Sequence, residues 1–207
     1  MPIGSILAFW GVAALLIVVP GVDWAFTIGA GLRRQVLPAA AGIVLGYLVM
    51  TAVVAAGLGA LIASTPVALT ALTVAGALYL AWLGIGTVRK PGTLGTEDGP
   101  RSGRLGTLVK GMAVSGLNPK GLLIFVAVLP QFTAAHNSWP VPAQLTCLGL
   151  AFVATCALVY PCVGLAARGL LRTKPVVALV VSRVSGVAMI VIGLILLAEP
   201  IWGIVQG

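Results

Sequence analysis

Residues 35–88 read QVLPAAAGIVLGYLVMTAVVAAGLGALIASTPVALTALTVAGALYLAWLGIGTV and contain no Asp, Glu, Lys or Arg. A helix that crosses a bilayer needs about 20 predominantly apolar residues, so this stretch is long enough for two membrane spans. The sequence Ser64-Thr65-Pro66 supplies a turn between them. The segment therefore predicts that this part of the chain is dissolved in lipid.

The composition of the whole chain extends this prediction. The 207 residues are 60% hydrophobic and 8% charged, and the mean hydropathy is +1.15. Soluble domains carry about 25% charged residues, which they need to cover a surface that faces water. Because backbone polar groups in hydrocarbon must bond internally, the apolar segments are predicted to be helices. We expect an all-α integral membrane protein with six transmembrane helices.

A polar segment divides the chain into two units. Residues 91–104 are rich in Gly and Pro and carry two of the four acidic residues close to basic ones, as in a linker. Each side of this linker holds enough apolar sequence for three spans. The predicted organisation is one membrane domain that consists of a first three-helix repeat, a cytoplasmic linker and a second three-helix repeat, at 1–90, 91–104 and 105–207.

The basic residues predict the orientation. Of the twelve Lys and Arg, all except Lys120 lie in the loops between spans 1 and 2, 3 and 4, or 5 and 6. The positive-inside rule makes these loops cytoplasmic, and it places both termini on the outer side of the membrane. This topology accounts for the net charge of +8. No basic stretch is interleaved with aromatics, and we expect no nucleic-acid partner.

Three spans is an odd number, so a duplicated second unit lies inverted relative to the first. Such inverted repeats are the architecture of many secondary transporters. The lead span of each unit is interrupted, at Pro20-Gly21 and at Asn118-Pro119. Proline removes a helix hydrogen bond, and paired interruptions in two halves point to a substrate site. Two proline kinks that only shape helix packing are the alternative.

A charge follows each interruption, Asp23 after the first and Lys120 after the second. Charges at membrane depth are costly and mark transport pathways or pair with one another. Asp23 suits a substrate ammonium, and Lys120 suits a carboxylate. The pair therefore predicts a site for a zwitterion. As alternatives, Asp23 is an N-cap for a restarting helix, and Lys120 extends to the headgroups.

Other intramembrane residues are weaker candidates. Asn118, Tyr79, Tyr160 and Gln131 are polar enough to line a cavity, although Tyr also anchors helices at the interface. The glycines are predicted to form small faces that let helices approach closely and that permit a homodimer. They are Gly42, Gly46, Gly76, Gly84 and Gly186.

The sequence predicts that the protein binds no metal and no cofactor and is not an enzyme. The three cysteines, Cys147, Cys156 and Cys162, form no CxxC pair, and His136 is the only histidine. No nucleophile lies in a pattern with a base. Export of a metal ion would need a cluster of intramembrane ligands, and Asp23 alone qualifies.

Taken together, the motifs resemble the LysE/RhtB family of amino-acid exporters, in order and over nearly the whole chain. The similar segments are Pro20-Gly21-Val22-Asp23, Gly31-Leu32-Arg33-Arg34, Gly42 with Gly46, the run from Gly76 to Gly84, Asn118-Pro119-Lys120, Leu129-Pro130-Gln131-Phe132, and Ser185-Gly186 with Gly193. Two departures stand out. Val22 takes the place of a second proline, and Met50-Thr51 takes the place of a His that many members carry.

The resemblance implies efflux of an amino acid or an amino-acid derivative across the inner membrane by proton antiport. Asp23 is then the candidate for coupling the proton to the substrate amine. Only the resemblance sets the direction of transport. Export of another small solute, such as a metal ion or a drug-like cation, is the alternative function.

Overall fold

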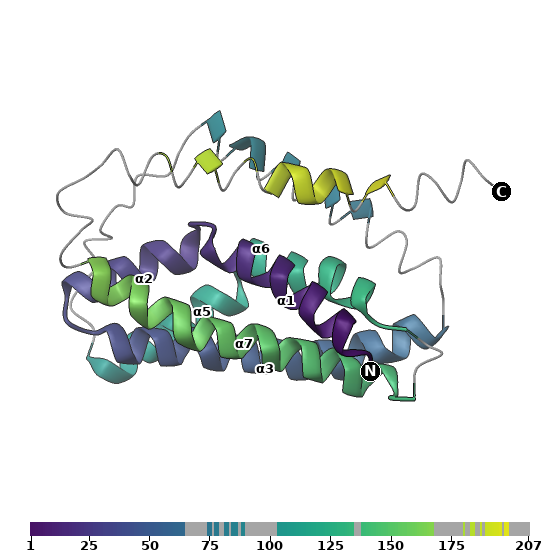
Figure 1. Cartoon of the computed structure of the whole chain (residues 1–207). Helices are drawn as coiled ribbons and strands as arrows, with labels where there is room; N and C mark the ends of the chain where they lie inside the picture. Colours follow the sequence, from purple (N-terminus) through teal and green to yellow (C-terminus); the bar gives the residue numbers. More distant parts are fainter. Residues whose placement is uncertain are drawn as a thin grey trace.

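The computed structural model describes residues 1–64, 103–134 and 138–167. It also describes shorter stretches, which are 74–75, 77–78, 81–82, 84–86, 88–89, 180, 183–184, 187, 189–195 and 197–198. All regular elements within these ranges are helical, which confirms the predicted all-α fold for this part of the chain (Figure 1). Residues 91–102 of the predicted linker (91–104), the residues Thr65 and Pro66 and most of the predicted third and sixth spans lie outside the described residues.

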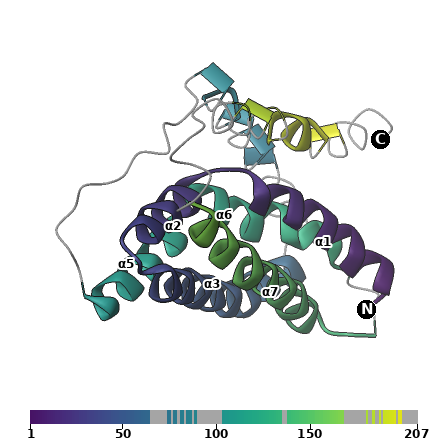
Figure 2. The same ribbon diagram turned by 60° about the vertical axis from the view of Figure 1, so that its left-hand side comes forward.

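Eight helical elements are given bounds in the described part of the chain. Their bounds are α1 (Ile3–Val18), α2 (Val22–Leu32), α3 (Val36–Ser64), α5 (Arg104–Gly116), α6 (Pro119–Leu123), the π-helical η1 (Ile124–Val128), the 3₁₀-helical η2 (Leu129–Phe132) and α7 (Val141–Ala166). The two long helices α3 and α7 pack side by side, and α5 lies against α3 (Figures 1 and 2). The shorter helices α1 and α2 pack against α7.

Two of the described helices are long and apolar enough to cross a bilayer alone. They are α3, through Val36–Gly57, and α7, with mean hydropathies of 2.2 and 2.0. Two further spans are possible if each bent pair counts as one: α1 with α2, which meet at 56°, and α5 with the segment Lys120–Phe132, which meet at 50°. The described part of the chain thus contains two to four of the six predicted spans.

Small residues line the contact between α3 and α5, which we call the seam. A Cβ added to Gly42 or Gly46 of α3 would collide with Leu108, or with Met112 and Ser115, of α5. At Gly111 of α5, an added Cβ would lie 2.8 Å from the Ala39 carbonyl oxygen. In lipid, helices associate through close van der Waals contact, because apolar side chains gain little by leaving hydrocarbon. These glycines therefore let α3 and α5 approach at backbone distance.

Apolar side chains also cover the outside of the bundle. Leu37, Leu105 and Leu158 are 77%, 75% and 72% exposed. Exposed leucines on this scale would be an aggregation hazard in water, and they match a surface that faces lipid.

Candidate functional site

The first helix break lies between α1 and α2. Val19 is extended (φ −63°, ψ 118°), as expected for a residue that precedes a proline, and Gly21 begins the next helix as its N-cap. The last carbonyls of α1 consequently lack the N–H donors that a continuing helix would supply. One of them, the Ile17 oxygen, accepts a 2.9 Å hydrogen bond from Trp24 Nε1.

The second break lies between α5 and α6. Asn118 is the N-cap of α6, and its Oδ1 accepts from the Lys120 backbone N–H at 3.0 Å. Pro119 occupies the first helical position, where a missing N–H costs nothing. The local sequence therefore both ends α5 and starts the next helix.

Lys120 brings the two breaks together. Its Nζ donates to the Val19 oxygen at 2.8 Å and to the Leu16 oxygen at 3.2 Å, and a Cβ on Gly21 would lie only 3.3 Å from this nitrogen. The Lys120 side chain is 4% exposed. The alternative in which Lys120 extends to the headgroups is therefore wrong. Two of its three N–H donors are used by carbonyls of α1 and of the residue that follows it.

Asp23 lies beside this junction and is fully buried. Its Oδ2 accepts three hydrogen bonds, from Tyr47 Oη at 2.6 Å, Asn118 Nδ2 at 2.9 Å and Tyr160 Oη at 3.0 Å. These donors come from α3, from the second break and from α7. The N-cap alternative for Asp23 is wrong, because Gly21 occupies the N-cap of α2 and the carboxylate bonds to other helices.

The two oxygens of Asp23 differ sharply. Oδ1 is buried and has no hydrogen-bond partner among the described residues. Leaving a buried polar atom unpaired costs about 1–3 kcal/mol, and more when the group is charged. An orphaned oxygen of this kind calls for a specific explanation, and a ligand bound at Oδ1 is one.

Aromatic side chains fix one wall of the site. Tyr47 stacks on Phe125 with ring centroids 5.9 Å apart, and Phe152 meets both rings edge-on, at 4.9 and 5.2 Å. Gly121 leaves room for the Tyr47 ring, because an added Cβ would lie 2.7 Å from a ring carbon. The Tyr47 hydroxyl is thereby held on Asp23.

The structure thus gathers Asp23, Asn118, Lys120 and Gly21 at one junction. Gln131 lies in η2, where its Nε2 donates to the Ala127 oxygen at 3.3 Å. Gly84 is buried in a short helical stretch. The side chain of Pro119 and the residues Gly76, Tyr79 and Gly186 lie outside the described residues.

Sequence analysis does not single out Tyr47, and it includes Tyr160 only as a cavity-lining candidate. Both hydroxyls lie deep within uncharged apolar segments rather than at their ends. A Tyr at that depth must find a partner for its O–H, so depth is the signal that separates a site tyrosine from an interfacial anchor.

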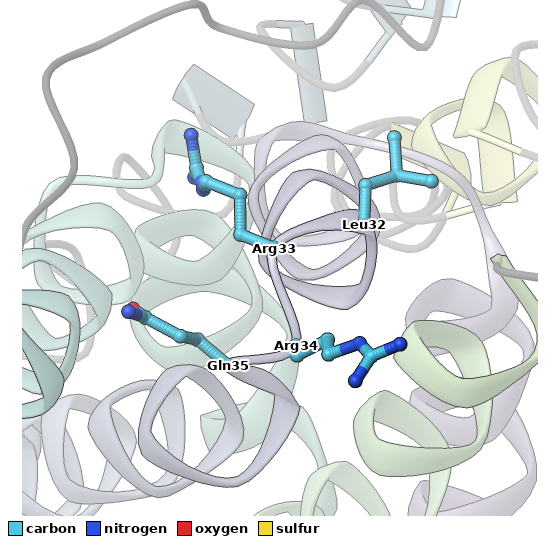
Figure 3. A pocket seen from close by; sticks show the side chains of 4 residues that line it. All are labelled: Leu32, Arg33, Arg34 and Gln35. Carbon is cyan, nitrogen blue, oxygen red and sulfur yellow. The ribbon is translucent and has the colours of Figure 1, made fainter.

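A separate cavity of about 320 Å³ lies at the turn between α2 and α3, lined by Leu32, Arg33, Arg34 and Gln35. Arg34 adopts a left-handed backbone (φ 61°), which tightens this turn. Figure 3 shows the side chains of Arg33, Arg34 and Gln35 pointing in different directions from the turn. They do not converge as a ligand site requires.

Comparison with known proteins gives consistent results. The model of the LysE type translocator family matches residues 14–199. An uncharacterized membrane protein of Vibrio cholerae is 32% identical over 158 residues, which cover 74% of this chain and 76% of that protein. No solved structure matches the chain.

Two similar proteins have names that state an activity. The leucine efflux protein of Klebsiella pneumoniae is 31% identical over 137 residues, and that of Enterobacter is 34% identical over 141 residues. The alignments cover 62% of this chain in both cases, and 63% and 64% of the relatives. The chain thus spans slightly less than two thirds of the leucine efflux proteins that it matches.

The family match extends from within α1 to beyond the last described residue, and it includes both helix breaks. The resemblance predicted from the motifs is therefore confirmed. Because the matched segment makes up most of the chain, the chain belongs to the LysE type translocator family, whose members are membrane exporters and not enzymes.

Proposed function

We propose that this protein exports an amino acid, with leucine or a similar aliphatic amino acid as the first candidate, across the bacterial inner membrane. One observation supports this function above the others: a fully buried carboxylate oxygen, Asp23 Oδ1, lies beside two helix breaks and has no hydrogen-bond partner in the described part of the chain. The names of the leucine efflux proteins supply the substrate candidate.

The substrate ammonium binds Asp23 Oδ1 in this proposal. Tyr47, Asn118 and Tyr160 already fill the other oxygen, so they orient the carboxylate and leave one acceptor for the ligand. A charge-assisted hydrogen bond in a dry site is strong enough to select an ammonium group. The aromatic wall of Tyr47, Phe125 and Phe152 provides apolar surface for an aliphatic side chain.

Alternating access follows from the burial of Asp23. A side chain with no exposed surface receives a substrate only after the helices rearrange. Two inverted three-helix repeats with broken lead helices, α1–α2 and α5–α6, provide two units that rock against each other. The two breaks meet at Lys120, so movement of one lead helix acts directly on the other.

Proton antiport uses the same oxygen. A proton and an ammonium group cannot both occupy Asp23 Oδ1, so one leaves as the other binds. Because of this exclusion, the carrier moves an amino acid outward in one step and returns with a proton bound in the next. We do not assign Lys120 to the substrate carboxylate, because its ammonium is engaged by the Val19 and Leu16 oxygens.

The test is efflux from proteoliposomes that contain the purified protein and a labelled solute. The panel includes leucine, isoleucine, threonine, lysine and a drug-like cation. We expect leucine to leave the proteoliposomes fastest. An inward proton gradient should accelerate leucine efflux, and an uncoupler that dissipates the gradient should abolish this acceleration. Efflux of the cation alone would favour the alternative solute, and leucine efflux unaffected by the uncoupler would refute proton coupling.

A further inference from the structure

Lys120 occupies an environment that normally binds a free cation. Its ammonium lies against two backbone carbonyls at the C-terminal end of α1, at 2.8 and 3.2 Å, and only 4% of the side chain is exposed. Carbonyls at the end of an interrupted helix, reinforced by the negative end of the helix dipole, are the ligands with which transporters hold Na⁺ and similar ions.

The acidic residue of the site does not neutralise this ammonium by direct contact. Asp23 Oδ2 accepts from Tyr47, Asn118 and Tyr160, and Oδ1 has no hydrogen-bond partner among the described residues. The described partners of the Lys120 ammonium are thus the α1 carbonyls. Asp23 is near enough to attract the ammonium electrostatically, but the hydrogen bonds that hold the ammonium in place go to the two carbonyl oxygens.

We propose that Lys120 is a tethered cation that fills a monovalent-cation site formed by the Leu16 and Val19 carbonyls. The lysine belongs to the second half of the chain and the carbonyls to the first, so the tether also holds the two breaks together. A consequence for transport follows, and it rests on the proposed function: the exporter needs no dissolved Na⁺ to stabilise its broken lead helix. Lys120 is then a positioning residue rather than a substrate ligand.

The decisive variant is Lys120→Ala, which removes the ammonium from both carbonyls; the Leu16 oxygen then keeps the Val19 backbone N–H at 3.2 Å. We expect the detergent-purified variant to melt below wild type. We also expect NaCl or methylammonium chloride to raise its Tm by about 2–4 °C, because an ion that binds only the folded state stabilises it. Choline chloride at the same ionic strength should have no such effect, because choline is too large for the site.

Wild type and Lys110→Ala are the controls. Lys110 is an exposed lysine of α5, so its loss removes the same charge without opening a carbonyl site. For each of these two proteins, the Tm should be the same in NaCl, methylammonium chloride and choline chloride. The proposal is overturned if Lys120→Ala responds no more than these controls, or if wild type shows the same rise.

Two further measurements cover the case in which Lys120→Ala does not fold. Lys120→Met keeps most of the packed volume and is tested in the same salts. Efflux by the wild-type protein is measured with choline in place of Na⁺, and the rate should not change. Na⁺-stimulated efflux by wild type would overturn the proposal. The salt response requires no transported solute, so it tests the cation site even if the amino-acid panel shows no efflux.

Discussion

The amide of Asn118 donates a 2.9 Å hydrogen bond to the carboxylate of Asp23, across 95 residues of sequence. The same side chain accepts from the Lys120 backbone N–H and so caps α6. Asn118 therefore connects the start of a helix in the second half to the orientation of the buried acid in the first. Helix geometry and the binding group cannot change independently at this point.

Asp23→Asn should abolish efflux. The amide has nearly the same shape as the carboxylate, but it carries no charge for an ammonium and takes up no proton. We expect at least a hundredfold loss of leucine efflux in proteoliposomes, with normal insertion and yield. Asp98→Asn, in the polar stretch that follows residue 90, removes an acid of the same kind as a control. Normal efflux by Asp23→Asn would remove this residue from the mechanism.

Asn118→Ser should separate helix capping from the contact with Asp23. Serine is as good an N-cap as asparagine, but its short side chain cannot also donate to the carboxylate. We therefore expect a Tm close to wild type and a loss of efflux of about tenfold or more. Asn118→Ala loses both contacts. It should lower the Tm as well, because the lost cap contributes about 1 kcal/mol to the free energy of unfolding. Equal Tm values for the Ser and Ala variants would contradict the capping role.

Tyr47→Phe and Tyr160→Phe each remove one donor from Asp23 Oδ2. A hydrogen bond to a charged group contributes about 1.5–3 kcal/mol, so each change should weaken leucine binding by roughly tenfold or more. The measurement is the concentration dependence of efflux. Thr155→Val in α7 is the matched control, since it removes a hydrogen bond to Trp10 that does not involve Asp23. A similar loss in that variant would show a general effect of packing.

Gly121→Ala should displace the Tyr47 ring, because the new methyl group would lie 2.7 Å from a ring carbon and 2.8 Å from the hydroxyl oxygen. Efflux should fall by an amount similar to that in Tyr47→Phe, and the two changes combined should cost little more than either alone. Gly116→Ala is the control, since no described residue lies within 4 Å of its added Cβ. Fully additive losses would show that Gly121 acts by another route.

Gly42→Ala should destabilise the protein without a direct effect on the binding residues. The added methyl group collides with the Leu108 carbonyl, and forcing an extra carbon into a packed seam costs about 1–3 kcal/mol. Gly57→Ala in the same helix meets no atom of the described residues within 4 Å and should be neutral or slightly stabilising. Thermal melting of the two variants in one detergent measures the difference. Equal Tm values would exclude a tight seam between α3 and α5.

Several features of the site could be predicted from the sequence. The charge-free run from Gln35 to Val88 predicts lipid-embedded helices, and prolines beside Asp23 and Lys120 indicate where the polar chemistry lies. The described helix α3 and the two described breaks agree with these predictions, because the bilayer acts on each segment separately: a helix must satisfy its own backbone, and a charge within it must have a reason.

Only the tertiary structure decides which groups meet. It directs Lys120 to the Val19 carbonyl and not to Asp23, and it adds Tyr47, which no motif distinguishes from an interfacial tyrosine. The sequence alone determines that this protein is helical, lies in the membrane and carries a charge beside each of two proline-containing breaks. Which groups each charge contacts depends on how the helices rotate and cross. The close glycine contacts between helices set this geometry, and no local sequence pattern encodes it.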